Sequence, residues 1–176
     1  MYKPQRNRSI LLKIITCGEG GVGKTTLLFR YIEGRFLADT LMTIGVQFHL
    51  KELNIGDKRV LLQVWDFGGQ DHFRPLLSSY AKGAKGALLL FDLTRPSSLS
   101  KIEEWVNICR EENPNNPILF VGTKLDLEKQ ITIDDAMALQ IKEEFGFFDY
   151  IKVSSKTGEN VQLVFESLAK ELVKEL

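Results

Sequence analysis

The chain has 176 residues, the size of one ordinary domain with a single substantial core. Its 23 lysines and arginines balance 23 aspartates and glutamates, so no overall field favours nucleic acid or an anionic membrane as a partner. No apolar run reaches the roughly 18 residues that a membrane span needs, and the N-terminus lacks a signal-peptide core.

Apolar and alternating segments predict the elements in chain order. Strands are expected at residues 10–15, 46–51, 60–65, 86–91, 118–122 and 150–153. Five helices are expected: one after residue 24, a short one after residue 70, one capped by Ser97 or Ser98, one capped by Thr132, and one over residues 161–172. Because strands alternate with helices, we predict a three-layer α/β fold. Its six-stranded sheet is mostly parallel, with one antiparallel edge strand.

The sequence GEGGVGKT at residues 18–25 fits G-x-x-x-x-G-K-[ST] and lies between a strand and a helix, a context that disfavours a chance glycine-rich turn. Such a loop wraps a polyphosphate with inward-pointing backbone N–H groups, and the helix adds its positive dipole end. Lys24 is expected to place its ammonium against the outer phosphates, and the Thr25 hydroxyl to ligate Mg²⁺. The predicted phosphate-binding residues are Gly20, Gly21, Val22, Gly23, Lys24, Thr25 and Thr26.

Residues that follow other strands belong to the same edge of such a sheet, where ligands bind. Asp66 is expected to hold Mg²⁺, usually through a water. Gly69 is placed to offer its backbone N–H to a terminal phosphate. Gln70 can both donate and accept, so it can orient a water for in-line attack on that phosphate.

The segment Thr123-Lys124-Leu125-Asp126 predicts which base is bound. The two acceptor oxygens of Asp126 complement the N1–H and N2–H₂ donors of guanine, whereas adenine offers no such pair. The Lys124 stem can cover one face of the base. The base pocket is expected to be completed by Thr123, Ser154, Ser155 and Lys156.

Together these four sites resemble the Ras superfamily of small GTPases, from about Ile10 to the last helix. The resemblance implies a G domain of the P-loop NTPase fold over residues 10–176, after an N-terminal tail at 1–9. It also implies that Thr43, 18 positions after Thr25, ligates Mg²⁺ in the triphosphate state, and that Phe36 packs on the guanine. The residues that match Rab effector contacts are Ile44, Phe48, Trp65 and Tyr80, although an aromatic cluster of this kind is also typical of a core.

Four features depart from or refine this resemblance. Thr123 stands where most members have asparagine, and residues 66–71 resemble the second switch of the Arf branch more than that of Rab and Ras proteins. Gly20 and Gly21 leave room for an incoming arginine. No built-in arginine finger is expected, because Arg35, Arg74 and Arg95 are interpreted as surface charges.

The resulting hypothesis is a slow GTPase switch that cycles between GTP and GDP with Mg²⁺ and meets effectors, exchange factors and GTPase-activating proteins through its switch regions. Two alternatives stay open: a GTP-bound scaffold with little hydrolysis, and an adenine-specific kinase or ATPase. We expect a cytoplasmic protein that would associate with membranes only if a lipidated tail had been removed. Cys17 and Cys109 are expected to be reduced, buried core fillers.

Overall fold

The computed structural model describes residues 8–38, 45–68 and 74–176, and within them the strands form one six-stranded sheet. The strand order is β2-β3-β1-β4-β5-β6. β2 pairs antiparallel with β3, and the other pairings are parallel. The strands are β1 (Ile10–Cys17), β2 (Val46–Ile55), β3 (Lys58–Phe67), β4 (Gly86–Asp92), β5 (Ile118–Thr123) and β6 (Asp149–Lys152). The predicted fold class is confirmed.

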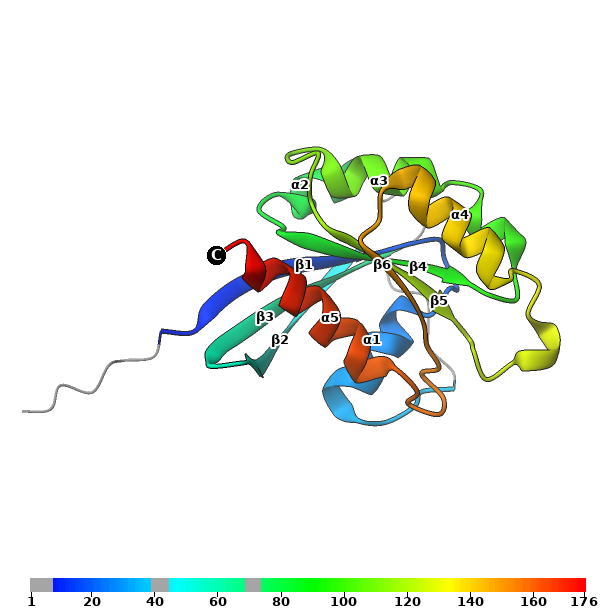
Figure 1. Ribbon diagram of the computed structural model, residues 1–176, viewed down its shortest axis with the longest axis horizontal. Coiled ribbons are helices and arrows are strands. Elements are labelled where there is room, and N and C mark those ends of the chain that lie inside the picture. The colour runs from blue at the N-terminus through cyan, green and yellow to red at the C-terminus, as the bar shows by residue number, and fades with distance from the viewer. Residues whose placement is uncertain (1–7, 39–44, 69–73) are drawn as a thin grey trace, which may run out of the picture.

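Helices cover both faces of this sheet, which makes three layers. Figure 1 shows α1 and α5 on one face and α2, α3 and α4 on the other. The helices are α1 (Lys24–Glu33), α2 (Arg74–Ala81), α3 (Ile102–Arg110), α4 (Asp135–Phe145) and α5 (Val161–Lys174), with the short 3₁₀ helices η2 (Pro96–Leu99) and η3 (Glu128–Gln130).

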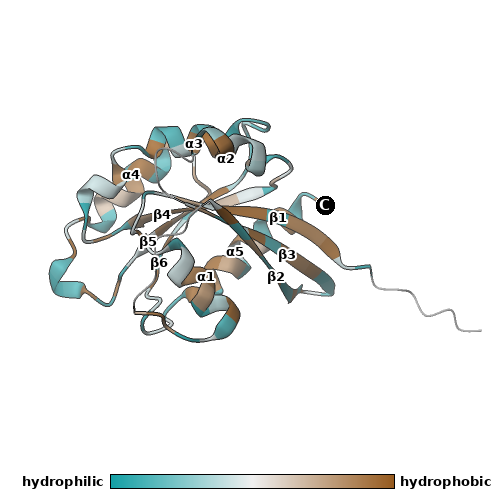
Figure 2. Ribbon diagram, turned by 180° about the vertical axis from the view of Figure 1, so that it is seen from behind, coloured by the Kyte–Doolittle hydropathy of each residue, from teal (hydrophilic) through white to brown (hydrophobic). Residues whose placement is uncertain are grey.

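Each face of the sheet has its own hydrophobic core. Because side chains alternate along a strand, β1 sends Ile14 to the core beneath α1 and α5 and Ile15 to the core beneath α2, α3 and α4. Every residue of β4 is buried, as expected for a central strand, and Figure 2 shows the hydrophobic colour along the inner strands. The predicted apolar stripe of the last helix is buried throughout: Val161, Val164, Phe165, Leu168 and Leu172.

The prediction that Ser97 or Ser98 caps the third helix is wrong. Pro96 opens the 3₁₀ helix η2 instead, and α3 begins only at Ile102. The Ser98 Oγ is engaged locally, since it accepts the Asp92 N–H at 3.0 Å and donates to the Arg95 carbonyl at 2.7 Å. The hydroxyl therefore stabilises a tight turn after β4 rather than the start of a helix.

The prediction that Thr132 caps the fourth helix is also wrong. The Thr132 N–H donates to the Leu93 carbonyl at 3.0 Å, which ties this residue to the end of β4. Asp134 is the cap, because its backbone is extended and its carboxylate accepts the Met137 N–H at 2.8 Å.

The cysteines behave as predicted, since Cys17 and Cys109 are both free and buried, with their Sγ atoms 3.4 Å apart. Across the described part of the chain, every helix is too short or too polar to cross a membrane.

Candidate functional site

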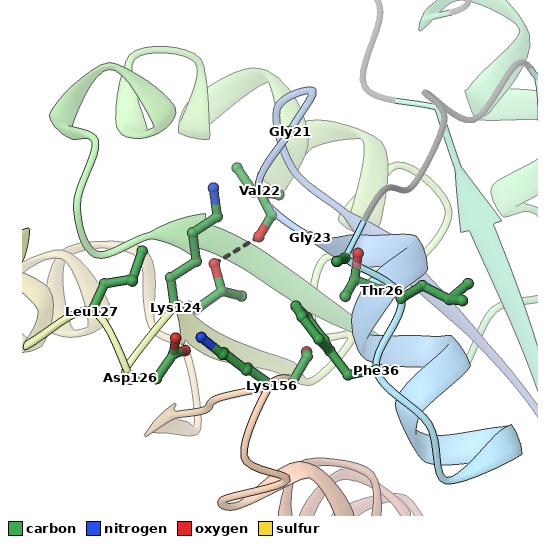
Figure 3. A pocket seen from close by; sticks show the side chains of 13 residues that line it. Gly21, Val22, Gly23, Thr26, Phe36, Lys124, Asp126, Leu127 and Lys156 are labelled. Carbon is green, nitrogen blue, oxygen red and sulfur yellow. Dashed lines mark hydrogen bonds between the residues drawn. The ribbon is translucent and has the colours of Figure 1, made fainter.

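A pocket of about 360 Å³ opens where the loops after β1, β5 and β6 meet. Figure 3 shows Lys124 and Phe36 on opposite sides of it, with Asp126 and Lys156 at its rim. It is lined by Gly21, Val22, Gly23, Thr26, Phe36, Leu37, Ala38, Thr123, Lys124, Asp126, Leu127, Ser155 and Lys156. The loop after β1 and the segment after β5, 100 residues apart in sequence, thus share one cavity, as the carboxyl-edge rule predicts.

Backbone geometry fixes the glycines of the loop between β1 and α1. Gly18 has a φ of 140°, and a Cβ there would lie 2.4 Å from the Leu90 carbonyl oxygen, so no other residue fits. Gly23 has a φ of 97° and precedes the first residue of α1. The loop therefore passes close to the sheet and delivers Lys24 and Thr25 at the start of the helix.

Lys24 is buried within this loop, with 6% of its surface exposed. Its Nζ donates to the carbonyls of Gly18 at 2.6 Å and Glu19 at 2.9 Å. Burial lowers the pKa of Lys24 to about 8, and the nearby carboxylate of Asp66 opposes that shift. An additional anion in the pocket would favour the charged ammonium in the same way.

Thr25 and Asp66 meet although they lie on different elements. The Thr25 Oγ1 donates to Asp66 Oδ2 at 2.6 Å, and Thr16 Oγ1 lies 3.3 Å from Asp66 Oδ1. Burial raises the pKa of Asp66, while the Thr25 hydrogen bond and the Lys24 charge oppose that rise. A hydroxyl and a carboxylate are hard oxygen donors, and Mg²⁺ beside phosphates is held by few protein ligands, so this pair fits the ion.

Asp126 is held by a second side chain. The Ser154 Oγ donates to Asp126 Oδ1 at 2.8 Å and itself accepts the Thr157 N–H at 3.1 Å. Ser154 is fully buried, whereas Ser155 and Lys156 line the pocket. The aspartate predicted to select the base therefore has a fixed orientation.

Thr123 links this region to the phosphate loop. Its Oγ1 lies 2.6 Å from the Val22 carbonyl oxygen and 3.0 Å from that of Phe91. A hydroxyl has one proton, so Thr123 can satisfy only one of these acceptors at a time. An asparagine amide, with two protons on one nitrogen, could serve both.

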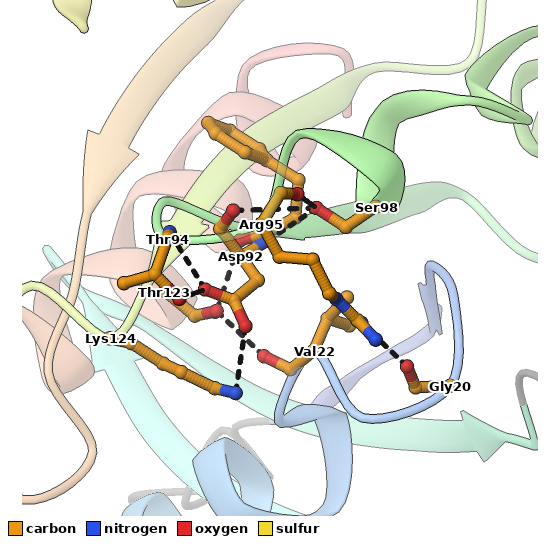
Figure 4. A network of polar contacts seen from close by, with 9 residues as sticks. Gly20, Val22, Asp92, Thr94, Arg95, Ser98, Thr123 and Lys124 are labelled. Carbon is orange, nitrogen blue, oxygen red and sulfur yellow. Dashed lines mark hydrogen bonds and ion pairs between the residues drawn. The ribbon is translucent and has the colours of Figure 1, made fainter. Parts of the chain in front are cut away.

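Lys124 is anchored by an aspartate that the sequence analysis did not single out. Its Nζ lies 2.7 Å from Asp92 Oδ2, and its backbone has a φ of 64° (Figure 4). Burial by itself would raise the pKa of Asp92, but the Lys124 ammonium and the Thr94 hydrogen bonds outweigh it and hold this pKa below its ordinary value. The Asp92 carboxylate therefore stays charged and fixes the Lys124 stem.

The interpretation of the arginines needs correction. Arg35 is exposed, as predicted, but Arg74 and Arg95 both reach the phosphate loop. The Arg74 Nη2 lies 2.7 Å from Glu19 Oε1, which also accepts the Trp105 Nε1–H at 3.0 Å, and Arg74 pairs with Glu104. These contacts were missed because they join residues that are far apart in sequence.

Several predicted residues lie outside the described ranges, namely Thr43, Ile44, Gly69 and Gln70. Three of the predicted effector contacts do lie within the described ranges: Phe48 on β2, Trp65 on β3 and Tyr80 on α2. Phe48 stacks on Trp65 with ring centroids 5.3 Å apart, and Trp65 lies 6.0 Å from Tyr80. Phe48 is 54% exposed and Tyr80 42%, whereas Trp65 is half-buried and packs against the core beneath α2, α3 and α4. The cluster therefore reaches from the core to the surface.

Comparison with known proteins finds relatives that match nearly the whole chain. A family model for the Ras family matches residues 13–174. The chain is 35% identical over 168 residues to Ras-related protein RAB1BV of Beta vulgaris, and the aligned region covers 94% of this chain and 78% of the relative. It is 32% identical over 181 residues to Ras-related protein Rab-8B of Dictyostelium discoideum, with 100% and 89% covered. It is 35% identical over 178 residues to Ras-related protein RABE1d of Arabidopsis thaliana, with 98% and 82% covered.

Proposed function

Because this chain belongs to the Ras family of small GTPases, we propose that it binds GDP and GTP with Mg²⁺ through the pocket described above and hydrolyses GTP slowly. Family membership makes it a GTPase and a guanine-nucleotide switch. One observation supports the assignment of the site: Asp126 and the phosphate loop border a single cavity. A nucleotide with its base at one end and its phosphates at the other matches that arrangement.

At the base end, Asp126 would accept the N1–H and N2–H₂ groups of guanine. A carboxylate has about four lone-pair sites, so the bond from Ser154 leaves enough acceptors for both donors. Adenine would instead turn its N1 lone pair toward the carboxylate, an unsatisfied contact that costs about 1–3 kcal/mol. Phe36 and the Lys124 stem would cover the base.

At the phosphate end, Lys24 would lie against the outer phosphates, and Thr25, Thr43 and Asp66 would hold Mg²⁺. The bound ion would supply positive charge against the charge that develops on the phosphates during hydrolysis. The N–H groups of Gly20 to Thr26 would add further donors.

Gln70 would orient the attacking water, and Thr43 and the Gly69 N–H would be tied to the γ-phosphate. Loss of that phosphate would release both ties, which is how the switch would be read. An arginine supplied by a partner would speed hydrolysis by about 10³–10⁵-fold, the range that arginine fingers supply in related GTPases.

The exposed aromatic cluster would serve as the effector surface, together with Ile44. Phe48, Trp65 and Tyr80 form a contiguous surface between β2, β3 and α2, and exposed aromatic groups of this kind favour protein contacts. Protein loaded with a non-hydrolysable GTP analogue should retain cytosolic proteins that the Phe48→Ala variant does not. Equal retention by the two would count against this surface.

Nucleotide uptake tests the proposal as a whole. The purified protein should take up a fluorescent GDP in the presence of Mg²⁺, lose it when Mg²⁺ is chelated, and exchange it against unlabelled GDP but not ADP. Competition by ADP would favour the adenine-specific alternative. Single-turnover GTP hydrolysis should slow in the Gln70→Leu variant, and an unchanged, negligible rate in both proteins would favour the GTP-bound scaffold.

A further inference from the structure

A positively charged side chain from the turn after β4 contacts the phosphate loop. Arg95 lies in the turn after β4, and its Nη2 donates to the Gly20 carbonyl at 2.7 Å. A Cβ built on Gly21 would lie 3.7 Å from both terminal nitrogens of the guanidinium, so this group also lies against the Gly21 backbone. Figure 4 shows the Arg95 side chain reaching from its turn to the loop at Gly20.

The backbone of Arg95 is held firmly. Its N–H donates to the Asp92 carbonyl at 3.0 Å, and its own carbonyl accepts both the N–H and the hydroxyl of Ser98, at 3.0 Å and 2.7 Å. Pro96 follows, which favours the extended backbone that Arg95 has, with φ −134° and ψ 95°. The side chain therefore starts from a fixed point, and less entropy is lost when it contacts the loop.

The charge of Arg95 has no carboxylate partner among the described residues. Its hydrogen bond there goes to a neutral carbonyl, and its Nε is buried without a partner. Lys24 lies in the same loop, so two cations share one region. A cation that is partly removed from water and has no carboxylate partner is costly, and a polyphosphate would supply the anion that Arg95 lacks among the described residues.

We propose that Arg95 is a positioning residue for the bound nucleotide: its guanidinium braces the phosphate loop at Gly20 and Gly21, and its charge helps to retain the polyphosphate. This inference rests on the proposed function, because it concerns how long GDP or GTP stays in that site. Arg95 would act on the phosphate loop and not on the hydrolysis step, so its loss should change the dissociation rate of the nucleotide.

The test compares Arg95→Gln and Arg95→Lys with a matched control. Arg110 also donates to backbone carbonyls, those of Phe145 and Gly146, but at the far end of α3. Release of fluorescent GDP in Mg²⁺ would be measured after addition of excess unlabelled GDP, at low and high salt. Arg95→Gln should release GDP about tenfold faster at low salt, since a charge-assisted hydrogen bond is lost. The release rate of Arg95→Lys should lie between those of the wild type and Arg95→Gln, and Arg110→Gln should release GDP at the wild-type rate.

The outcomes distinguish a failure of the proposed function from a failure of the role assigned to Arg95. If the wild type takes up no fluorescent GDP, the proposed function fails. If the wild type binds GDP but Arg95→Gln releases it at the wild-type rate, or if Arg110→Gln accelerates release equally, the role of Arg95 is wrong. The GDP release rates of the wild type and Arg95→Gln should differ less at high salt than at low salt. If that difference is the same at both salt concentrations, and Arg95→Lys releases GDP as fast as Arg95→Gln, the charge of Arg95 has no role and the proposal is wrong. Thermal unfolding of each nucleotide-free variant shows whether faster GDP release merely reflects misfolding. If Arg95→Gln does not fold, the comparison of Arg95→Lys with the wild type decides.

Discussion

The two ends of the pocket are built differently. At the base end, Asp126 is bonded to Ser154 and Lys124 to Asp92, partners that can stay in place when a base enters. At the phosphate end, Lys24 donates to the carbonyls of its own loop and Thr25 donates to Asp66, and these are the groups that would turn to phosphates and Mg²⁺. Under the proposed function, base selection would be set in advance by the fold, whereas phosphate binding would exchange one set of contacts for another.

The two ends differ in energy as well. The base end satisfies its buried charge internally, because the Asp92 carboxylate is paired with an ammonium. The phosphate end holds Lys24 at 6% exposure and places Arg95 beside it, with the pKa of Lys24 lowered to about 8 mainly by burial. A site that gathers buried positive charge gives up stability of the free protein in return for affinity toward an anion.

The largest expected effect breaks the phosphate end. Lys24→Met removes the ammonium but keeps an unbranched chain, so GDP affinity should fall by at least about 100-fold. In the nucleotide-free protein the change removes a poorly solvated charge, but it also removes the donor to the Gly18 and Glu19 carbonyls and the cation near Asp66, so stability should change less than GDP affinity. Titration with fluorescent GDP and thermal unfolding give the two numbers, and Lys174→Met, at an exposed position, is the control. Affinity close to that of the wild type would show that Lys24 does not meet the phosphates.

The next effect breaks the base end. In Asp126→Asn the Oδ1 can still accept from Ser154, which turns the amide nitrogen toward the base. A donor would then face the N1–H donor of guanine, and GDP affinity should fall by about 10–100-fold. Xanthosine diphosphate has a carbonyl in place of the 2-amino group, so the variant should prefer it. Equal affinity for GDP in the variant and the wild type would refute the assignment of Asp126.

The base end was also the better predicted of the two. Thr123 is the last residue of β5, and Asp126 and Ser154 lie just after β5 and β6. Because the carboxyl ends of parallel strands meet at one edge, their proximity follows from the strand pattern. Phe36 lines the same pocket, and its packing on the guanine stays a prediction. The order and type of the strands and helices were predicted equally well, because the apolar periods are long and regular.

The phosphate end was predicted in its motif but not in its supports. Glu19, Arg74 and Trp105 come together from a loop and two helices, and no local pattern specifies which arginine reaches which carboxylate. Asp92 is the last residue of β4 and Arg95 lies in the turn after it, so the same edge rule that indicated Asp126 also applies to them. Pro96 after Arg95 is a local signal of a fixed turn there.

A smaller effect on GDP release is expected from substitutions of Thr123, which connects the two ends of the pocket. Thr123→Asn supplies two amide protons where the hydroxyl has one, so the Val22 and Phe91 carbonyls could both be satisfied. We expect GDP release to slow by about threefold to tenfold, the gain of one net hydrogen bond. Thr123→Val, which keeps the shape without a donor, should release GDP faster than the wild type. Faster release from Thr123→Asn would mean that the larger side chain is not accommodated.

The smallest effect concerns the support of the phosphate end and requires no nucleotide. Glu19→Gln keeps an oxygen for the Trp105 N–H but removes the charge that faces Arg74, in a pair whose side chains are only 12% and 19% exposed. The free energy of unfolding of the nucleotide-free protein should fall by about 1 kcal/mol, as measured in urea by tryptophan fluorescence. Glu52→Gln is the matched control, because it breaks the pair with Arg59, whose side chains are 50% and 54% exposed. That variant should stay within about 0.5 kcal/mol of the wild type, since solvent screens the pair. If the two variants lose the same free energy, the Glu19–Arg74 contact contributes no more than a surface pair does, and it is not a support of the phosphate end.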